Sequence, residues 1–152
     1  MYDKQKSELI SEMYKISCCR DGEQDYICDK LVEYNLSKVK ASQDVLFEDI
    51  NKKIVDKDVK IIAGCVARMY CWNILFIDIL WVEENYRNYG FGKRLLFYIE
   101  KTASEKGCYL VDLDTFDFQA LGFYEKLGYE IFGKLDDSPK NHCRYFLKKY
   151  LT

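Results

Sequence analysis

The stretch that most constrains this chain runs from Ile79 to Leu96 and joins an apolar segment directly to a helical pattern. The apolar run stops at residues 83–85, and the helical pattern begins after a turn that contains Gly90 and Gly92. The first N–H groups of a helix lack internal partners, and the helix dipole adds partial positive charge there. Glycine lets the backbone approach a ligand closely and adopt conformations that a Cβ forbids. This order of strand, turn and helix predicts an anion site, most often one for phosphate.

The spacing of the glycines separates the known phosphate-binding patterns. A P-loop needs Gly five residues before Gly92-Lys93 and Ser or Thr after that pair, but Arg87 and Arg94 occupy these positions. The dinucleotide fingerprint needs a small residue three positions after Gly92, where this chain has Leu95. What remains is Arg-x-x-Gly-x-Gly after a strand. This pattern resembles the pyrophosphate-binding motif of the GCN5-related N-acetyltransferases (GNAT), a family that uses acetyl-coenzyme A.

Hydrophobic periodicity predicts an α/β fold with a mixed sheet, in the order β-α-β-β-β-α-β-α-β-β. Gly107 is placed to end the helix that follows the glycine turn, and Gly64 is a candidate bulge in a long β-rich run. The strand Ile74–Val82 is apolar enough to be central and covered on both faces. The predicted strands are 13–19, 45–51, 59–72, 74–82, 109–115, 129–135 and 142–150, with a turn region from 51 to 58 and helices at 26–38, 90–106 and 118–127.

A second segment, Ala120–Tyr129, adds to the resemblance because ALGFYEKLGY matches the family's Ala-x-x-x-Tyr-x-x-x-Gly-aromatic pattern. The family fold has the predicted element order, and its fourth and fifth strands separate to hold the acyl carrier between them. The resemblance covers residues 41–150 well and the first 40 residues poorly. Three positions depart from the common family pattern: Glu84 replaces Pro, Asn88 replaces Gly, and Asp117 replaces an Asn that often contacts the carrier arm.

The two motifs imply roles for the residues around them. Tyr124 is the expected general acid, because a phenol with a pKa of about 10 can protonate a departing thiolate. Asp78, the single charge inside its apolar strand, and Glu83 and Glu84 at the strand end are the alternative general bases. Each has a structural alternative, which is core packing for Tyr124 and ion pairing or solvation for the carboxylates. The expected cofactor-binding set comprises main-chain groups of Trp81 and Val82 for the pantetheine arm, and Arg87, Asn88, Tyr89, Gly90, Phe91, Gly92 and Lys93 for the pyrophosphate.

Composition limits the other classes of protein. At 152 residues, with 49% apolar and 32% charged residues, the chain is expected to form a single domain over 1–152. Apolar runs fall short of the roughly 18 residues of a membrane span, and the charged N-terminus lacks the apolar core of a signal peptide, so we expect a cytoplasmic protein without a membrane partner. A net charge of −2 without a basic band argues against nucleic acid. Seven Cys without Cys-x-x-Cys spacing and the single His142, expected to be structural, argue against a metal site.

The function implied by the resemblance is acetyl transfer from acetyl-coenzyme A to an amine, by direct attack within a ternary complex and without an acyl-enzyme. The expected partner is an amine acceptor, in the first instance a small molecule, and a homodimer is left open. Two rivals remain, namely a non-catalytic acyl-coenzyme A sensor of the same fold and a nucleotide-binding regulatory domain of another fold. The acceptor itself stays open, because fold does not determine function.

Overall fold

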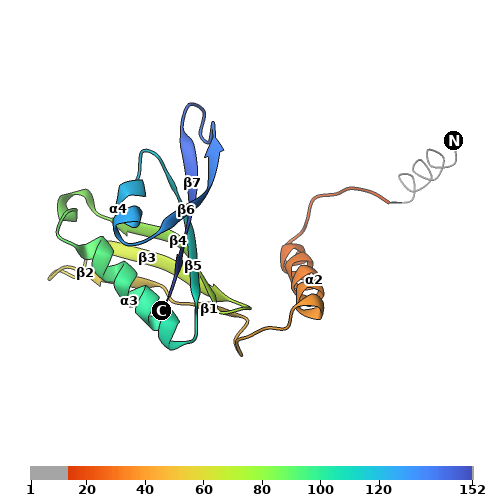
Figure 1. Ribbon diagram of the computed structural model, residues 1–152. Coiled ribbons are helices and arrows are strands. Elements are labelled where there is room, and N and C mark those ends of the chain that lie inside the picture. The colour runs from red at the N-terminus through yellow and green to blue at the C-terminus, as the bar shows by residue number, and fades with distance from the viewer. Residues whose placement is uncertain (1–13, 152) are drawn as a thin grey trace. The chain divides into compact units, whose positions relative to one another are not determined.

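A computed structural model of the protein describes residues 14–151, which divide between two compact units at residues 40 and 41 (Figure 1). The first unit contains helix α2 (Glu23–Lys38), with acidic residues in its first turn and a basic residue in its last, as the helix dipole favours. The predicted helix 26–38 is therefore confirmed, with an earlier start. The predicted strand 13–19 is wrong for residues 14–19, which form no strand, and Met13 lies outside the described residues. That residues 1–152 form one domain stays a prediction.

Residues 41–151 form a mixed sheet with helices packed against it (Figure 1). Its elements are β1 (Phe47–Asp49), β2 (Lys52–Val55), β3 (Ile61–Tyr70), β4 (Ile74–Val82), the 3-10 helix η1 (Glu84–Tyr86), α3 (Phe91–Glu105), β5 (Leu110–Phe116), α4 (Leu121–Lys126), β6 (Glu130–Asp136) and β7 (Cys143–Tyr150). The strand order is β1-β3-β4-β5-β7-β6, and β2 also pairs with β3. β4 and β5 run parallel, joined through α3, while the other neighbours are antiparallel. The predicted mixed α/β fold is confirmed.

The hydrophobic core lies between this sheet and α3. Leu95, Ile99 and Ala103 recur at helical spacing on the buried side of α3, as predicted. The largest fully buried side chains are Met69, Leu75, Leu96, Ile99, Leu147, Val111 and Cys65. Strand β4 has the predicted bounds but not the predicted surroundings, because Leu75 and Ile77 are buried whereas Ile79 is 51% exposed. No helix within residues 14–151 is long and apolar enough to span a membrane.

The predicted strand 45–51 is in fact followed at once by a second strand. β1 pairs with the end of β3, and β2 pairs with its start. Between them, the side-chain oxygen of Asn51 accepts the N–H of Ala67 at 3.0 Å, which replaces a backbone bond of the ladder. Lys52 and Lys53 therefore belong to β2, and the turn expected over 51–58 begins later.

A bulge lies in β4, not at Gly64 as expected. Gly64 pairs regularly with residues of both neighbouring strands. The register between β3 and β4 shifts between Val66 and Ala67, and the residue of β4 left without a partner is Asp78. A bulge adds one residue to a strand, bends it and increases its twist. The bulge predicted at Gly64 was therefore wrong, although β3 has an irregularity against β2 at Ile62. Register depends on pairing between distant segments.

The two parallel strands separate at this same point. Their ladder ends with Ile77 opposite Leu113. Beyond it, β4 continues to Val82 along β3, and β5 continues to Phe116 along β7. The sheet therefore opens between β4 and β5, as the family resemblance implied.

Candidate active site

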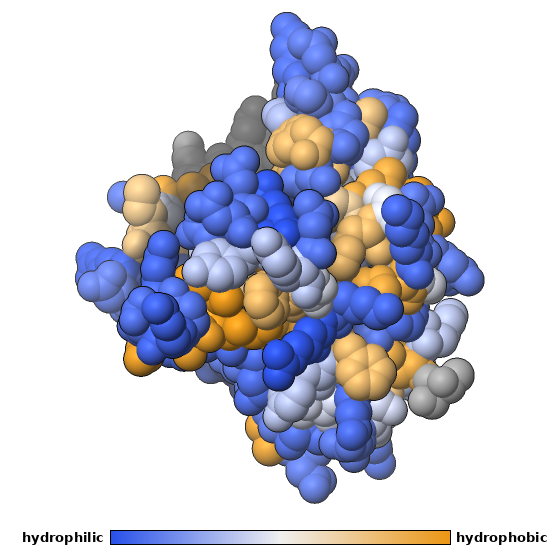
Figure 2. All heavy atoms as spheres, turned by 90° about the vertical axis from the view of Figure 1, so that its left-hand side faces the viewer, coloured by the Kyte–Doolittle hydropathy of each residue, from blue (hydrophilic) through white to orange (hydrophobic). Residues whose placement is uncertain are grey.

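A cleft of about 830 Å³ occupies the opening between β4 and β5. Its walls are the end of β4, the turn into α3, residues 114–115 of β5, and α4. Figure 2 views the molecule from the side of the turn into α3, where apolar side chains show between hydrophilic ones. The predicted site residues that line the cleft are Asp78, Trp81, Val82, Arg87, Asn88, Gly90, Phe91, Gly92, Lys93 and Tyr124.

Three predicted site residues lie outside the lining of the cleft. Glu83 faces Lys60, with 3.8 Å between Oε2 and Nζ. Glu84 begins η1 and is exposed, and the side chain of Tyr89 is 75% exposed. Of the three carboxylates considered as bases, the structure brings only Asp78 to the cleft.

The turn before α3 holds two residues in the left-handed conformation. They are Asn88, with φ 65°, and Gly90, with φ 82°. Asn is one of the few residues other than Gly that tolerate this region, which explains how Asn88 stands where relatives often have Gly. Gly92 lacks a positive φ, and a Cβ there would meet Phe123 and Val82 at ordinary contact distances of 3.5 and 3.6 Å. The conformational demand of the turn therefore falls on positions 88 and 90.

The first turn of α3 favours an anion. It contains no acidic residue, and Gly90 supplies no side-chain cap. Lys93 and Arg94 stand there instead, although the helix dipole disfavours cations at this end. The N–H groups of Phe91, Gly92 and Lys93 have no acceptor within the helix. A bound phosphate group would satisfy these N–H groups and balance the cations at once.

The end of β4 offers backbone groups to the cleft. Beyond Ile77, β4 pairs with β3 on one side, and on the other side it has no partner strand within residues 14–151. An extended, amide-rich ligand could add there as a further strand. The backbone carbonyl of Val82 already has a partner, because Nε of Arg87 donates to it at 3.2 Å. This hydrogen bond holds the turn against the end of β4.

Tyr124 reaches the cleft from α4. It is 6% exposed, and its hydroxyl has no hydrogen-bond partner within residues 14–151. Burial, reinforced by the neighbouring Cys65 and Asp114, raises the pKa of Tyr124 to about 12. Its ring packs edge-on against Phe123 and Tyr129, with centroid distances of 5.2 and 5.6 Å. At neutral pH this phenol is a proton donor without an acceptor.

Tyr129 connects Tyr124 to the rest of the fold. The hydroxyl of Tyr129 donates to Oε1 of Glu100 on α3 at 2.8 Å, and Nζ of Lys149 on β7 donates to Oε2 at 2.7 Å. The backbone N–H of Tyr129 donates to the carbonyl of Tyr124 at 3.1 Å, after Gly128 ends α4 with φ 85°. Contacts from three elements therefore hold the ring on which Tyr124 packs.

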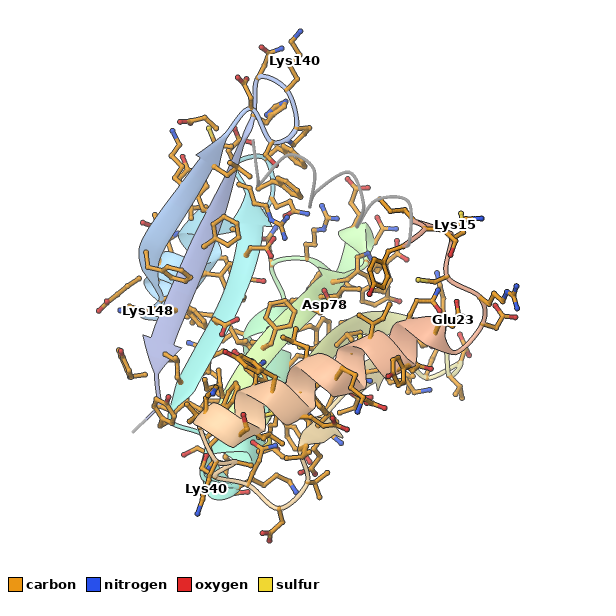
Figure 3. The ribbon with its side chains drawn as sticks, turned by 90° about the vertical axis from the view of Figure 1, so that its right-hand side faces the viewer. Lys15, Glu23, Lys40, Asp78, Lys140 and Lys148 are labelled. Atoms are coloured by element: carbon orange, nitrogen blue, oxygen red, sulfur yellow. The ribbon has the colours of Figure 1, made fainter. Side chains whose placement is uncertain are left out.

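Two carboxylates stand where the strands separate. Asp78 and Asp114 directly follow Ile77 and Leu113, the last pair of the ladder, and both line the cleft. Asp114 is held by Arg144 through two hydrogen bonds, Nε to Oδ1 at 2.7 Å and Nη2 to Oδ2 at 2.5 Å. Asp78, which is labelled on β4 in Figure 3, is exposed and forms no hydrogen bond or ion pair within residues 14–151.

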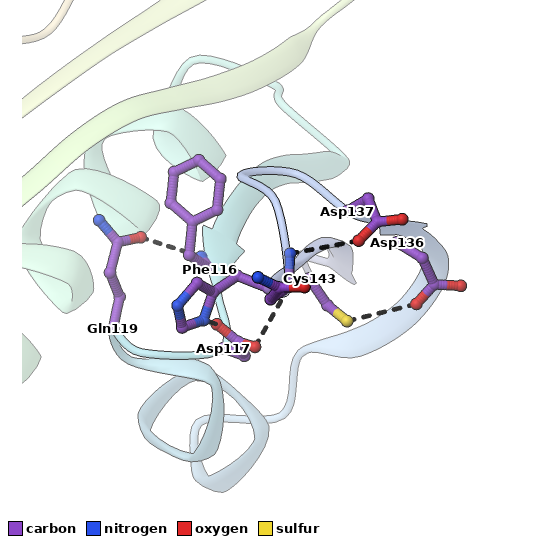
Figure 4. Close-up of polar contacts among 8 residues, drawn as sticks. Phe116, Asp117, Gln119, Asp136, Asp137 and Cys143 are labelled. Atoms are coloured by element: carbon purple, nitrogen blue, oxygen red, sulfur yellow. Dashed lines mark hydrogen bonds and ion pairs between the residues drawn. The ribbon is translucent and has the colours of Figure 1, made fainter.

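Asp117 does not line the cleft. Its Oδ2 accepts the N–H of Cys143 at 3.1 Å, and its Oδ1 lies 3.0 Å from Nδ1 of His142 (Figure 4). The N–H of Asp117 in turn donates to the carbonyl of Cys143 at 2.9 Å. Asp117 and His142 thus join the end of β5 to the start of β7, which is the structural role expected of His142.

Sequence reasoning missed the contribution of β5 and of the connection from β5 to α4. Asp114 alternates with buried Leu113 and Thr115, so the period of two in this strand could have identified it. Gln119 stabilises the connection between β5 and α4, because its Oε1 accepts the N–H of Phe116 at 2.9 Å. The further lining residues are Ile77, Ile79, Leu80, Tyr86, Phe118, Ala120, Gly122 and Phe123. Within residues 14–151, no group of three or more His, Cys, Asp or Glu side chains could hold a metal ion.

Comparison with known proteins places this cleft in context. A family model described as "Acetyltransferase (GNAT) domain" matches residues 48–131. A blasticidin-S acetyltransferase of Streptomyces morookaense is 36% identical over 91 residues, which are 59% of this chain and 67% of that protein. The crystal structure of an acetyltransferase from Bacillus cereus is 38% identical, with a TM-score of 0.83 over 92% of this chain and 99% of the other. An aminoglycoside 6'-N-acetyltransferase solved with coenzyme A shares the fold, at 23% identity and a TM-score of 0.61 over 69% of this chain and 74% of the other.

Proposed function

Because the chain belongs to the GNAT acetyltransferase family, whose members are acyltransferases that use acetyl-coenzyme A, we propose that it acetylates the nitrogen of a small-molecule amine. What carries the proposal is that one cleft joins an anion site at α3 to the unpartnered hydroxyl of Tyr124, whose ring is buried. The name of the blasticidin-S relative supports a small-molecule acceptor.

The residues of the cleft fit acetyl-coenzyme A. The N–H groups at the start of α3, with Lys93 and Arg87, would hold its pyrophosphate. The free backbone edge of β4 would hold its pantetheine arm. When bound, acetyl-coenzyme A supplies a thioester, which is an acyl group on a thiol that can leave. The protein contributes mainly by holding this thioester and the amine together in one site.

An amine arrives as an ammonium group and must lose a proton before its nitrogen can attack. Among the three carboxylates considered, Asp78 is favoured for this step, because it lines the cleft while Glu83 faces Lys60. It can take the proton directly or orient a water molecule that carries the proton away. The new C–N bond then forms as the C–S bond breaks.

The departing sulfur needs a proton, and Tyr124 is placed to give it. Burial keeps its hydroxyl protonated at neutral pH, since the pKa of Tyr124 is raised to about 12. The second proton lost by the acylated nitrogen returns to Tyr124 through water. The products are an amide and a free thiol, with one proton released to solvent. Direct attack needs no acyl-enzyme, and no covalent step on the protein is proposed.

The proposal is tested by following free thiol release from acetyl-coenzyme A with a panel of amines that includes blasticidin S. We expect thiol release that depends on the acceptor. We also expect an acetylated product about 42 mass units heavier than the amine, because an acetyl group replaces one hydrogen atom. Binding of acetyl-coenzyme A without turnover of any amine would instead favour the acyl-coenzyme A sensor. Absence of binding would remove both.

A further inference from the structure

The charges that line the cleft are segregated along its length. Arg87 and Lys93 lie beyond the end of β4, beside the start of α3. Asp78 and Asp114 lie at the other end, where the strands separate. Four residues of strand lie between Asp78 and the end of β4, which correspond to about 13 Å. The positive end suits the pyrophosphate, so the negative end is left to the acceptor.

The carboxylates at this end are unequally balanced. Asp114 is fully engaged by the guanidinium of Arg144. Arg68, on the neighbouring strand β3, is likewise paired with Asp49, at 2.6 Å between Nε and Oδ1. Asp78 forms no ion pair within the described part of the chain, although its charge also raises the pKa of Arg68. Because Asp49 already pairs with that guanidinium, Asp49, Asp78 and Arg68 together keep one net negative charge at the acceptor end.

A second observation indicates that a ligand belongs at this end. Tyr124 is 6% exposed, lines the same cleft and has a hydroxyl without a partner within residues 14–151. The hydroxyl oxygen itself is not fully buried, so it opens onto the cleft and is free to form a hydrogen bond with a ligand there. Asp114 contributes to the raised pKa of Tyr124, which places the hydroxyl within electrostatic reach of Asp114.

The reaction itself limits what can balance Asp78. The attacking nitrogen must be neutral, so it cannot neutralise a carboxylate at the moment of attack. When a water molecule carries the proton away, Asp78 keeps its charge and still needs a cation. Phe118, which is 57% exposed, lines the cleft and offers an aromatic side chain to such a group.

We propose that the acceptor is a basic amine with a second positive charge, which pairs with Asp78, and without an anionic group near the reacting nitrogen. This inference rests on the proposed function and names the substrate class of the same site. We therefore expect diamines and other polycationic amines to be better acceptors than amino acids and phosphorylated amino sugars, whose anionic groups would face Asp78.

Three acceptors of five carbon atoms each test the inference: cadaverine, pentylamine and 5-aminopentanoate, whose distal groups are an ammonium, a methyl and a carboxylate. We expect kcat/KM to fall in that order, by about tenfold at each step. The first step loses a charge-assisted hydrogen bond to Asp78, and the second adds repulsion between two carboxylates. Cadaverine has two equivalent amino groups, so its kcat/KM is expected to be about twice that of pentylamine for statistical reasons alone. Only a larger ratio supports the inference.

Variants locate the preference at one residue. Asp78→Asn should reduce the cadaverine-to-pentylamine ratio to the statistical value, and Asp78→Lys should favour 5-aminopentanoate over cadaverine. The matched control is Asp112→Asn, because Asp112 lies two residues before Asp114, is bonded to the hydroxyl of Tyr70 and does not line the cleft. This variant should keep the ratio. Calorimetry with acetyl-coenzyme A reports whether each variant is folded.

The ratio also distinguishes an anchor from a base. If Asp78 acts only as a base, Asp78→Asn lowers turnover of both amines equally, the ratio is unchanged, and the inference is overturned while the proposed function stands. Equal kcat/KM for the three acceptors would overturn it as well. If other amines are turned over but none of these three, the order of their inhibition constants decides in the same way. Failure of every amine would instead contradict the proposed function.

Discussion

At the scale of single residues, the hydroxyl of Tyr124 is expected to contribute to chemistry rather than to packing. Tyr124→Phe keeps the ring against Phe123 and Tyr129 but removes the proton donor. We expect kcat to fall by about 10²-fold, at the low end for a general acid because a thiolate leaves readily, with little change in acetyl-coenzyme A affinity. Steady-state kinetics with an identified amine measures the first quantity and calorimetry the second.

Tyr86→Phe is the matched control, because Tyr86 lines the same cleft from η1. Its loss of a hydroxyl should leave kcat within about a factor of three, as for a residue that gives no proton to the reaction. An unchanged kcat in Tyr124→Phe would make Tyr124 a core residue, and water would then be the proton donor.

The ionisation of Tyr124 gives a second prediction. Its pKa in the folded protein is raised to about 12, whereas an unfolded phenol has a pKa of about 10. The folded state therefore holds this proton more tightly, so the associated stability is present below about pH 10 and is lost as the pH rises through about 12. The tyrosinate absorbance of the wild type minus that of Tyr124→Phe should show a titration step near pH 12. A step near pH 10 would mean that the phenol is solvated.

At the scale of elements, the turn between β4 and α3 depends on backbone conformation more than on space. A Cβ added at Gly90 or at Gly122 would meet no atom within 4 Å, but only Gly90 has a positive φ, of 82°. We expect Gly90→Ala to destabilise by about 1–2 kcal/mol and to weaken acetyl-coenzyme A binding. Gly122→Ala, within α4, should stabilise by up to about 1 kcal/mol.

Urea unfolding of the two variants side by side checks these signs. Both substitutions add one methyl group beside the cleft, so a difference between them isolates the conformational effect. Equal changes in the free energy of unfolding would show that the left-handed residue before α3 carries no special demand.

At the scale of the whole molecule, acetyl-coenzyme A should stabilise the folded state. A ligand at a hundredfold over its Kd adds about 2.7 kcal/mol, which for a chain of 152 residues raises Tm by roughly 5–10 °C. Thermal unfolding with acetyl-coenzyme A and with an equal concentration of ATP measures this effect. ATP should give a much smaller shift, because it lacks the pantetheine arm that pairs with β4. A larger shift with ATP would favour the nucleotide-binding rival.

The local features of this chain could be predicted from its sequence. Periodicity placed β4 with its observed bounds and the helix after Gly90 within one residue of its observed ends, because side-chain spacing and the conformational needs of glycine act over a few residues. The turn from Arg87 to Gly92 carries its anion-binding character in its own backbone and in the helix that follows. The resemblance to a family rested on such local motifs and was confirmed.

The cleft itself was decided by tertiary structure. Asp78 became the bulged residue, and Asp114 its neighbour across the gap, only through the register of β4 against β3 and the end of its ladder with β5. Sequence reasoning could not choose among Asp78, Glu83 and Glu84, because which carboxylate faces a cleft depends on strands distant along the chain. Likewise, the raised pKa of Tyr124 comes from burial by the assembled core. Backbone conformation is a local property, whereas register, burial and solvation are set by residues that only folding brings together.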